Sequence, residues 1–535
     1  MKKLFMMALS AAMALSIAGC KKPEVKPVET ALTLMDQVNA KNIVSLDNTM
    51  RLWYQINPAL FTDKVTGEPG TVRSILTDIE YLSDGDPETS EDLNMSGILL
   101  TDIMLLDDVN APKDLQSLNP LVGSEEDLQS LFSRAAGLNM PVMLTMEFSC
   151  ISKENPEFRR MIDTVNQNAD AENLFEMDPV LFGEFYVEKD KPEEDGWTKI
   201  GNTAYSYRSL PQTDIPRINL ENERIRQIIQ ESVSHYLDLG AGGFYVPDYN
   251  DLFVGEDQKA ADFMNWFNSI VKEKNEQAVT VFSYSSWNEP MNSVPVFAAD
   301  QAGVGAEGMI AKAATGAISA RDLGAYLEGV NVQSGGMNAS FINNTNSSLD
   351  LLKVNNRLPQ YKMALALQIM TSGQIFLMSG DELGLTSEQT DLILDAIEAP
   401  EMQDDEDSSE ASSGTQINLE FGSLADQKKD GNSILNFVQQ AIKLRDSYSA
   451  IASGSMTWSQ ELSTDQMLVI DKRSTNSECV LVFNLSDKEA QLDTTPIKIS
   501  GLPAELGGVL LSSTDEIKLE NNSLTLPPYS MALLK

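Results

Sequence analysis

Residues 240–248 read Gly-Ala-Gly-Gly-Phe-Tyr-Val-Pro-Asp, and this stretch contains one complete passage from a helix to a strand. Before it, residues 224–239 place apolar side chains at helical spacing, and Gly240 is a residue type that commonly ends helices. Residues 243–246 form a short apolar run, and Pro247 stops it because proline has no amide hydrogen to donate to a sheet. This order predicts one β/α unit.

The same alternation of strand-like and helix-like patterns continues along the chain. With 535 residues, 42% of them hydrophobic, the protein is long enough for two or three domains with real cores. Alternating apolar runs and amphipathic helical patterns favour parallel β/α units, and eight such strands form a barrel. The predicted strands are residues 52–56, 97–104, 141–148, 243–246, 278–284, 309–314, 339–343 and 374–378.

Several motifs occur in a fixed order over nearly the whole chain. Residues 53–61 (Trp-Tyr-Gln-Ile-Asn-Pro-Ala-Leu-Phe), 209–219, 374–384 and 526–530 resemble, in this order, segments of the α-amylase family, glycoside hydrolase family 13. The resemblance implies an α/β fold: a (β/α)8 TIM barrel with a small domain inserted after strand 3 and a C-terminal all-β sandwich. The expected boundaries are 45–150 and 220–450 for the barrel, 151–219 for the inserted domain and 451–535 for the sandwich.

Aromatic residues are frequent in the expected inserted domain. They could stack on sugar rings, but aromatic side chains among charged residues more often pack a small irregular domain, so we expect packing. The residues are Phe185, Tyr186, Trp197, Tyr205 and Tyr207.

The resemblance also locates three catalytic carboxylate positions, and none of them holds a carboxylate. The nucleophile position is Pro247, the acid/base position is Ser283 and the third position is Asn346. Retaining hydrolysis of a glycoside needs two carboxyl groups about 5 Å apart, and neither a proline ring nor a serine hydroxyl can replace them. The family's arginine position is Tyr245. The sequence therefore predicts a catalytically inactive scaffold.

Three functions stay open for this scaffold. The first is glycan binding, with α-glucan as the first candidate, in a cleft formed by Tyr245, Asp248, Tyr284, Trp287, Asn344 and Asn346. The second is a diverged, active glycoside hydrolase whose carboxylates have moved to Asp248, Asp251, Glu147 or Glu289. The third is a non-catalytic partner subunit of an envelope complex. Fold resemblance alone does not choose among them.

The N-terminus predicts a lipid anchor. Two lysines precede an apolar stretch over residues 4–17, and small residues lead to Cys20, which resembles a bacterial lipoprotein signal. The resemblance implies a signal peptide over residues 1–19, acylation of Cys20 and a tether over residues 20–44. We therefore expect an extracytoplasmic protein held by lipid on a bacterial membrane, the outer rather than the inner one.

Charge and residue types exclude several partners and cofactors. The 39 basic and 79 acidic residues give a net charge of −40, which argues against nucleic acid because phosphates would be repelled. No metal site or other cofactor is expected, since the chain has no Cys-x-x-Cys pair and one histidine, His235, predicted on a helix surface. Calcium binding by the acidic loop at residues 404–414 is the alternative left open, although its carboxylates lack regular ligand spacing.

Overall fold

The computed structural model describes most of the chain between Met50 and Lys535. The described residues are 50–61, 70–86, 92–191, 196–247, 252–253, 256–284, 296–298, 308–333, 338–340, 352–371, 373–386, 389, 419–511 and 516–535.

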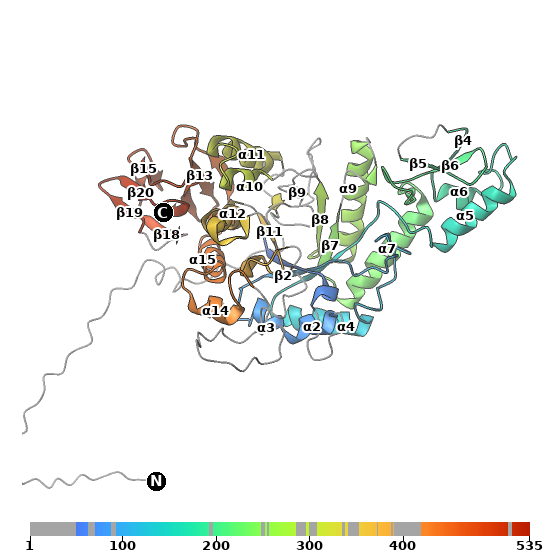
Figure 1. Cartoon of the computed structure of the whole chain (residues 1–535), viewed down its shortest axis with the longest axis horizontal. Helices are drawn as coiled ribbons and strands as arrows, with labels where there is room; N and C mark the ends of the chain where they lie inside the picture. Colours follow the sequence, from blue (N-terminus) through green and yellow to red (C-terminus); the bar gives the residue numbers. More distant parts are fainter. Residues whose placement is uncertain are drawn as a thin grey trace, which may run out of the picture.

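A closed barrel of eight parallel strands forms the centre of the molecule (Figure 1). Around the barrel the strand order is β1-β11-β10-β9-β8-β7-β3-β2, so the first and last strands pair and close the sheet. This confirms the predicted TIM barrel. The strands are β1 (Leu52–Ile56), β2 (Gly97–Leu100), β3 (Val142–Thr145), β7 (Gly243–Val246), β8 (Val279–Tyr284), β9 (Val296–Ala298), β10 (Asn338–Ser340) and β11 (Gln374–Met378).

One predicted strand was wrong. Residues Met309–Ala314 form helix α10, and the sixth barrel strand is β9, which precedes it. The sequence of α10, Met-Ile-Ala-Lys-Ala-Ala, is made mostly of strong helix formers and contains a single β-branched residue. The apolar content suggested a buried strand, but the helical propensity decided the local structure.

Helices surround the barrel, and their ends follow local rules. Helix α4 (Glu125–Gly137) begins with a capping box in which Ser124 and Asp127 satisfy each other's backbone amides. Helix α7 (Glu223–Leu239) begins at the cap Asn222 and ends at Gly240, whose φ of 116° is accessible to glycine at little cost. The other long helices of the barrel are α9 (Asp257–Lys274), α11 (Ala320–Gln333), α12 (Leu358–Thr371) and α15 (Ile434–Asp446).

A small domain is inserted between β3 and α7 and lies at one end of the molecule in Figure 1. It contains α5 (Pro156–Gln167), α6 (Pro179–Gly183) and an antiparallel sheet of β4 (Val187–Lys189), β6 (Tyr205–Arg208) and β5 (Trp197–Lys199). Its aromatic side chains are mostly buried, which confirms the packing interpretation. Exposed fractions are 5% for Phe185, 7% for Trp197, 4% for Tyr205 and 5% for Tyr207.

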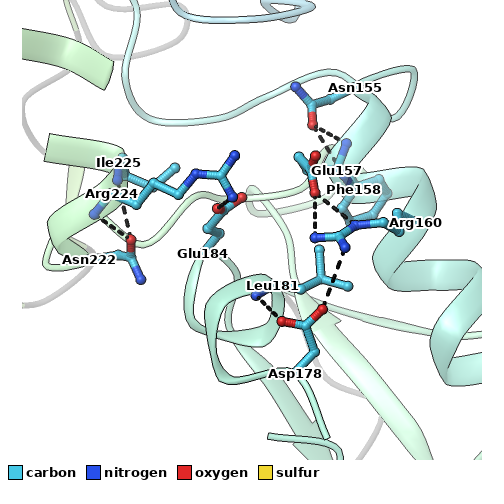
Figure 2. A network of polar contacts seen from close by, with 10 residues as sticks. All are labelled: Asn155, Glu157, Phe158, Arg160, Asp178, Leu181, Glu184, Asn222, Arg224 and Ile225. Atoms are coloured by element: carbon cyan, nitrogen blue, oxygen red, sulfur yellow. Dashed lines mark hydrogen bonds and ion pairs between the residues drawn. The ribbon is translucent and has the colours of Figure 1, made fainter. Parts of the chain in front are cut away.

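Ionic contacts hold the inserted domain together and join it to α7 (Figure 2). Arg160 on α5 bonds to Glu157 and reaches Asp178, which caps α6. Glu184, whose side chain is 3% exposed, forms an ion pair of 2.7 Å with Arg224 in the first turn of α7. The loop of the inserted domain is thereby tied to the barrel helix that leads to β7.

The C-terminal domain is all-β and confirms the predicted sandwich. Its larger sheet has the order β12-β13-β14-β21-β18, and a second sheet has the order β15-β20-β19. The two sheets share a core that includes Val469, Val482 and Leu526. The strands are β12 (Ser455–Trp458), β13 (Met467–Arg473), β14 (Glu478–Asn484), β15 (Ala490–Asp493), β18 (Leu506–Leu511), β19 (Lys518–Glu520), β20 (Ser523–Leu526) and β21 (Ser530–Leu534).

Candidate functional site

The side chains on the inner face of the barrel show which positions of each strand lie near the barrel mouth. A separate apolar cluster fills the interior and consists of Trp53, Leu99, Met143, Val279, Val281 and Phe376, with Tyr245 packed against it. Since successive side chains of a strand point to opposite faces, residues two positions further along each strand form the next inner layer. That layer lies toward the carboxyl ends of the strands, where barrel enzymes place their chemistry.

Pro247 and Ser283 lie two positions beyond Tyr245 and Val281, toward the carboxyl ends of β7 and β8. Tyr245 of β7 pairs in register with Val281 of β8, and the next pair is Val246 with Phe282. Pro247 and Ser283 therefore follow side by side at the ends of two neighbouring strands, two residues beyond inward-facing partners. These are the positions that the resemblance assigns to nucleophile and acid/base. Their backbones are neighbours in the register of β7 and β8, and neither residue type carries a carboxyl group.

Tyr245 occupies the position of the family's arginine and contributes to the apolar interior. Its ring lies 6.5 Å from the ring of Phe376, and Phe376 stacks on Trp53 with ring centroids 6.1 Å apart. Trp53 donates its indole N–H to Gln374 Oε1 at 2.5 Å. The floor below the mouth is therefore aromatic.

The backbone beneath this floor has no room for larger residues. A Cβ atom added to Gly243 at the start of β7 would lie 2.1 Å from the carbonyl oxygen of Val279 on β8. Glycine is thus required where these two strands meet. The glycine-rich sequence before β7 has a packing reason that is independent of catalysis.

Most of the other predicted site residues lie outside the described residues. These are Asp248, Trp287, Asn344 and Asn346 of the cleft, Asp251 and Glu289 of the relocated-site alternative, the lipidation residue Cys20 and the acidic loop at 404–414. The backbone of Tyr284 ends strand β8. Glu147 is described, and its carboxylate accepts the backbone N–H of Ser149 at 2.5 Å, so it closes the turn after β3.

Sequence reasoning missed a polar pair at the mouth. Asn57 follows β1, Asp102 follows β2, and Asn57 Nδ2 donates to Asp102 Oδ2 at 2.8 Å. Desolvation by neighbouring groups raises the pKa of Asp102, although the residue is exposed to solvent. The signal available in the sequence was a polar residue within two positions of the end of each of two neighbouring strands.

A buried polar cluster lies behind the turn that follows β11. Tyr54 and Tyr81 each donate to Glu382 Oε1 at 2.7 Å, and Lys353 forms an ion pair of 2.8 Å with Asp381. Burial raises the pKa of Glu382 to about 7, because it outweighs the hydrogen bonds that would lower it. The side chains of Glu382, Tyr54 and Asp381 are shielded from solvent, so this cluster is structural.

Three further features of the described part of the chain bear on function: possible metal sites, the single histidine and possible membrane-spanning helices. The described residues contain no group of three or more His, Cys, Asp or Glu placed to hold a metal ion. The His235 imidazole lies 2.9 Å from Glu125 on the helix surface, which confirms its predicted place. None of the described helices combines the length and the apolar character needed to cross a membrane.

A groove of about 600 Å³ lies at the junction of the barrel and the C-terminal domain rather than at the barrel mouth. The connection from α10 to α11 forms one wall and turns of the C-terminal domain form the other. Its lining includes Ile318, Asp322, Asp465, Asp487 and Tyr529.

Comparisons with known proteins agree with this architecture. The model of the family "Alpha amylase, catalytic domain" matches residues 55–454. Glucan 1,6-alpha-glucosidase of Streptococcus pneumoniae is 22% identical over 233 residues, which is 42% of this chain and 40% of that protein. Trehalose-6-phosphate hydrolase of Bacillus subtilis is 24% identical over 38% of this chain and 36% of its own length. The chain thus matches about two-fifths of the length of each of these relatives.

Solved structures match over much more of the chain. Eubacterium rectale Amy13B superimposes with a TM-score of 0.78 at 22% identity, over 94% of this chain and 98% of that one. The α-amylase from H.orenii gives a TM-score of 0.69 at 18% identity, over 91% of this chain and 99% of that one. At these identities the likeness establishes the fold.

Proposed function

Because the chain belongs to the α-amylase family, we propose that it is a non-hydrolytic member that binds glycan at the mouth of its barrel. One observation carries the proposal: the register of β7 and β8 brings the backbones of Pro247 and Ser283 next to each other at the carboxyl ends of these strands. The scaffold that presents a nucleophile and an acid is thus preserved, while both chemical groups are missing.

The replaced groups fit binding better than hydrolysis. A covalent glycosyl intermediate needs a carboxylate nucleophile, and departure of the leaving group needs a carboxylic acid. Hydroxyl, amide and aromatic groups such as those of Ser283, Asn346 and Trp287 still hydrogen-bond sugar hydroxyls and stack on sugar rings. We propose that Tyr245, Asp248, Tyr284, Trp287, Asn344 and Asn346 contribute to this binding surface.

The names of the matched relatives suggest the first ligands to test. The two relatives described above are named as a glucan 1,6-alpha-glucosidase and a trehalose-6-phosphate hydrolase, so soluble α-glucans are the first panel. A neutral glycan held by hydrogen bonds and ring stacking should bind weakly here, with Kd on the order of 0.1–1 mM, or roughly 4–5.5 kcal/mol. Binding of a neutral ligand should also depend little on salt.

Two measurements test the proposal together. Purified protein is incubated with starch, maltooligosaccharides and aryl α-glucosides, and the same sugars are titrated by calorimetry or NMR. We expect no hydrolysis above background and saturable binding that Trp287→Ala weakens. The matched control is Phe175→Ala, which removes a half-exposed aromatic side chain from the inserted domain. Turnover that is lost in Asp248→Asn or Glu289→Gln would instead establish the relocated active site.

We also propose that the protein is lipid-anchored outside the cytoplasm, most simply on the outer membrane. The support is the signal-like sequence that ends at Cys20. Cys20→Ser should release the protein from the membrane fraction or leave the precursor uncleaved. If fractionation and processing stay unchanged, the anchor proposal fails. If the protein binds no glycan but co-purifies with one envelope protein, the partner-subunit function replaces glycan binding.

A further inference from the structure

The polar pair Asn57 and Asp102 lies where two neighbouring barrel strands end. Strands β1 and β2 pair in parallel, with Ile56 in register with Leu100. The backbone N–H of Thr101 donates to the carbonyl of Ile56 at 2.9 Å, which keeps the two strand ends together. Asn57 and Asp102 are therefore presented at the carboxyl end of the barrel, the same end as Pro247 and Ser283.

The backbone of Asp102 adopts an uncommon conformation. Its φ is 53°, in the left-handed region that residues other than glycine rarely occupy. Aspartate and asparagine tolerate this region better than other residues, but the conformation still costs free energy relative to an extended one. Such residues are concentrated at sites that bind ligands. Here the conformation belongs to a bend that follows β2, where the Asp102 side chain meets Asn57.

Asn57 holds the carboxylate of Asp102 in one orientation. The Asn57 Oδ1 atom accepts the backbone N–H of Ala59 at 3.0 Å and so fixes the amide plane. The same amide donates through Nδ2 to Asp102 Oδ2 at 2.8 Å. A ligand that reaches Asp102 would therefore meet a carboxylate that is already oriented, and little side-chain entropy would be lost on binding.

The carboxylate keeps acceptor capacity for a ligand. An ionised carboxylate offers about four acceptor positions. In the described part of the chain, Asp102 receives a side-chain hydrogen bond from Asn57 and forms no ion pair. Its side chain is partly exposed to solvent. The Asp102 carboxylate is thus exposed, held in one orientation and able to accept further hydrogen bonds. These three properties suit a group that recognises vicinal hydroxyls.

We propose that Asp102, oriented by Asn57, accepts hydrogen bonds from vicinal hydroxyls of a glycan bound at the barrel mouth. This inference rests on the proposed glycan-binding function and names a binding group that the family resemblance does not supply. Asp102 is a binding residue in this proposal and transfers no proton. Asn57 is the positioning residue.

Asp102→Asn tests the proposal with little risk to the fold. Asparagine has the same size and also tolerates positive φ, so the turn after β2 should persist. The substitution removes the charge and replaces one acceptor oxygen by a donor. We expect Kd for the best-binding α-glucan to rise roughly tenfold, because the ligand loses hydrogen bonds to a charged acceptor. The urea midpoint should stay at the wild-type value.

Asp190→Asn is the matched control. Asp190 has a φ of 57° and is exposed, but it lies in a turn of the inserted domain. Its substitution should leave glycan affinity unchanged. Asn57→Ala supplies the second test, because loss of the orienting amide should weaken binding by a smaller factor than loss of the carboxylate.

The outcomes separate this inference from the function on which it rests. If the wild type binds glycan and Asp102→Asn binds equally well, the role of Asp102 is overturned and glycan binding stands. If the wild type binds no glycan in the panel, both proposals fail. If the wild type hydrolyses a glycoside and Asp102→Asn abolishes turnover, Asp102 is catalytic and the non-hydrolytic function is overturned.

Discussion

Tyr54 in the first barrel strand donates a hydrogen bond of 2.7 Å to Glu382 in the turn after the last strand, 328 residues away in sequence. Tyr81, on the helical segment that follows β1, donates to the same oxygen at 2.7 Å. The backbone N–H of Gly380 donates to the other oxygen of Glu382 at 3.1 Å. One buried carboxylate thus receives donors from both sides of the seam where the barrel closes.

This arrangement makes stability depend on pH. Burial raises the pKa of Glu382 from 4.5 to about 7, so the folded protein holds a proton there that the unfolded chain has lost. The contribution of protonated Glu382 to the free energy of unfolding is fully present below pH 4.5. It is lost as pH rises through about 7, and the loss is on the order of 3 kcal/mol. Urea unfolding at pH 5 and pH 8 should show that Glu382→Gln becomes more stable relative to wild type at the higher pH.

The control for this prediction is Glu489→Gln on an exposed turn of the C-terminal domain. It should shift stability equally at both pH values. A Glu382→Gln variant that does the same would show that the Glu382 carboxyl titrates no differently in the folded and unfolded states. Asp446, whose pKa burial also raises to about 7, contributes in the same pH window in every variant and cancels from the comparison.

Lys353→Met should be strongly destabilising because it leaves a buried charge without its partner. The side chains of Lys353 and Asp381 are 0% and 2% exposed and form an ion pair of 2.8 Å. Loss of one partner of a buried pair costs about 3–5 kcal/mol. Denaturant unfolding should give this value for the single variant, and Asp381→Asn added to Lys353→Met should recover part of it.

A surface pair provides the comparison for Lys353. Lys274 and Asp238 lie 2.7 Å apart, but their side chains are 38% and 65% exposed. Lys274→Met should change stability by less than about 1 kcal/mol. Equal effects of the two lysine substitutions would contradict the assigned role of the buried pair.

Tyr245→Arg would restore the residue type that the family resemblance places at this position, but it should destabilise this protein. A guanidinium would face the ring of Phe376 and the apolar interior instead of a catalytic carboxylate. Burying an unpaired charge should cost at least about 3 kcal/mol. Tyr245→Phe, which keeps the ring, should stay within about 1.5 kcal/mol of wild type.

Thermal or urea unfolding of Tyr245→Arg and Tyr245→Phe measures this difference in stability. An arginine variant as stable as the phenylalanine variant would mean that the interior still provides acceptors for a guanidinium. That result would also revive the relocated active site, since an arginine-compatible floor is a feature of the catalytic arrangement.

Arg224→Ala should loosen the inserted domain. The Glu184 side chain is 3% exposed and depends on Arg224, which is itself 46% exposed, so solvent partly replaces the lost partner. We expect a local cost of about 1–2 kcal/mol. Hydrogen exchange or limited proteolysis should report faster opening of residues 151–219, with the barrel unaffected.

The exposed pair of Lys153 and Asp214 gives a control within the same domain. Its side chains are 45% and 60% exposed, and Lys153→Ala should leave exchange nearly unchanged. If both variants opened the domain alike, the Glu184–Arg224 contact in Figure 2 would have no special anchoring role.

The sequence by itself determined the strands that carry a strong local signal. Residues 52–56, 243–246 and 374–378 form strands with the predicted bounds, because each is a short apolar run between breaking residues. The sequence also determined that two of the family's carboxylate positions hold Pro247 and Ser283, because the motifs around them can be aligned without a structure. The sixth strand could not be read correctly, because a short apolar run does not distinguish a buried strand from a buried helix.

Only the tertiary structure decided which distant groups meet. Glu382 joins Tyr54 and Tyr81, Lys353 neutralises Asp381, and Asn57 orients Asp102, because barrel closure and parallel pairing bring strand ends together that are far apart in sequence. Local preferences set the elements, but contacts between them depend on strand order and register, which residues distributed over the whole chain determine jointly.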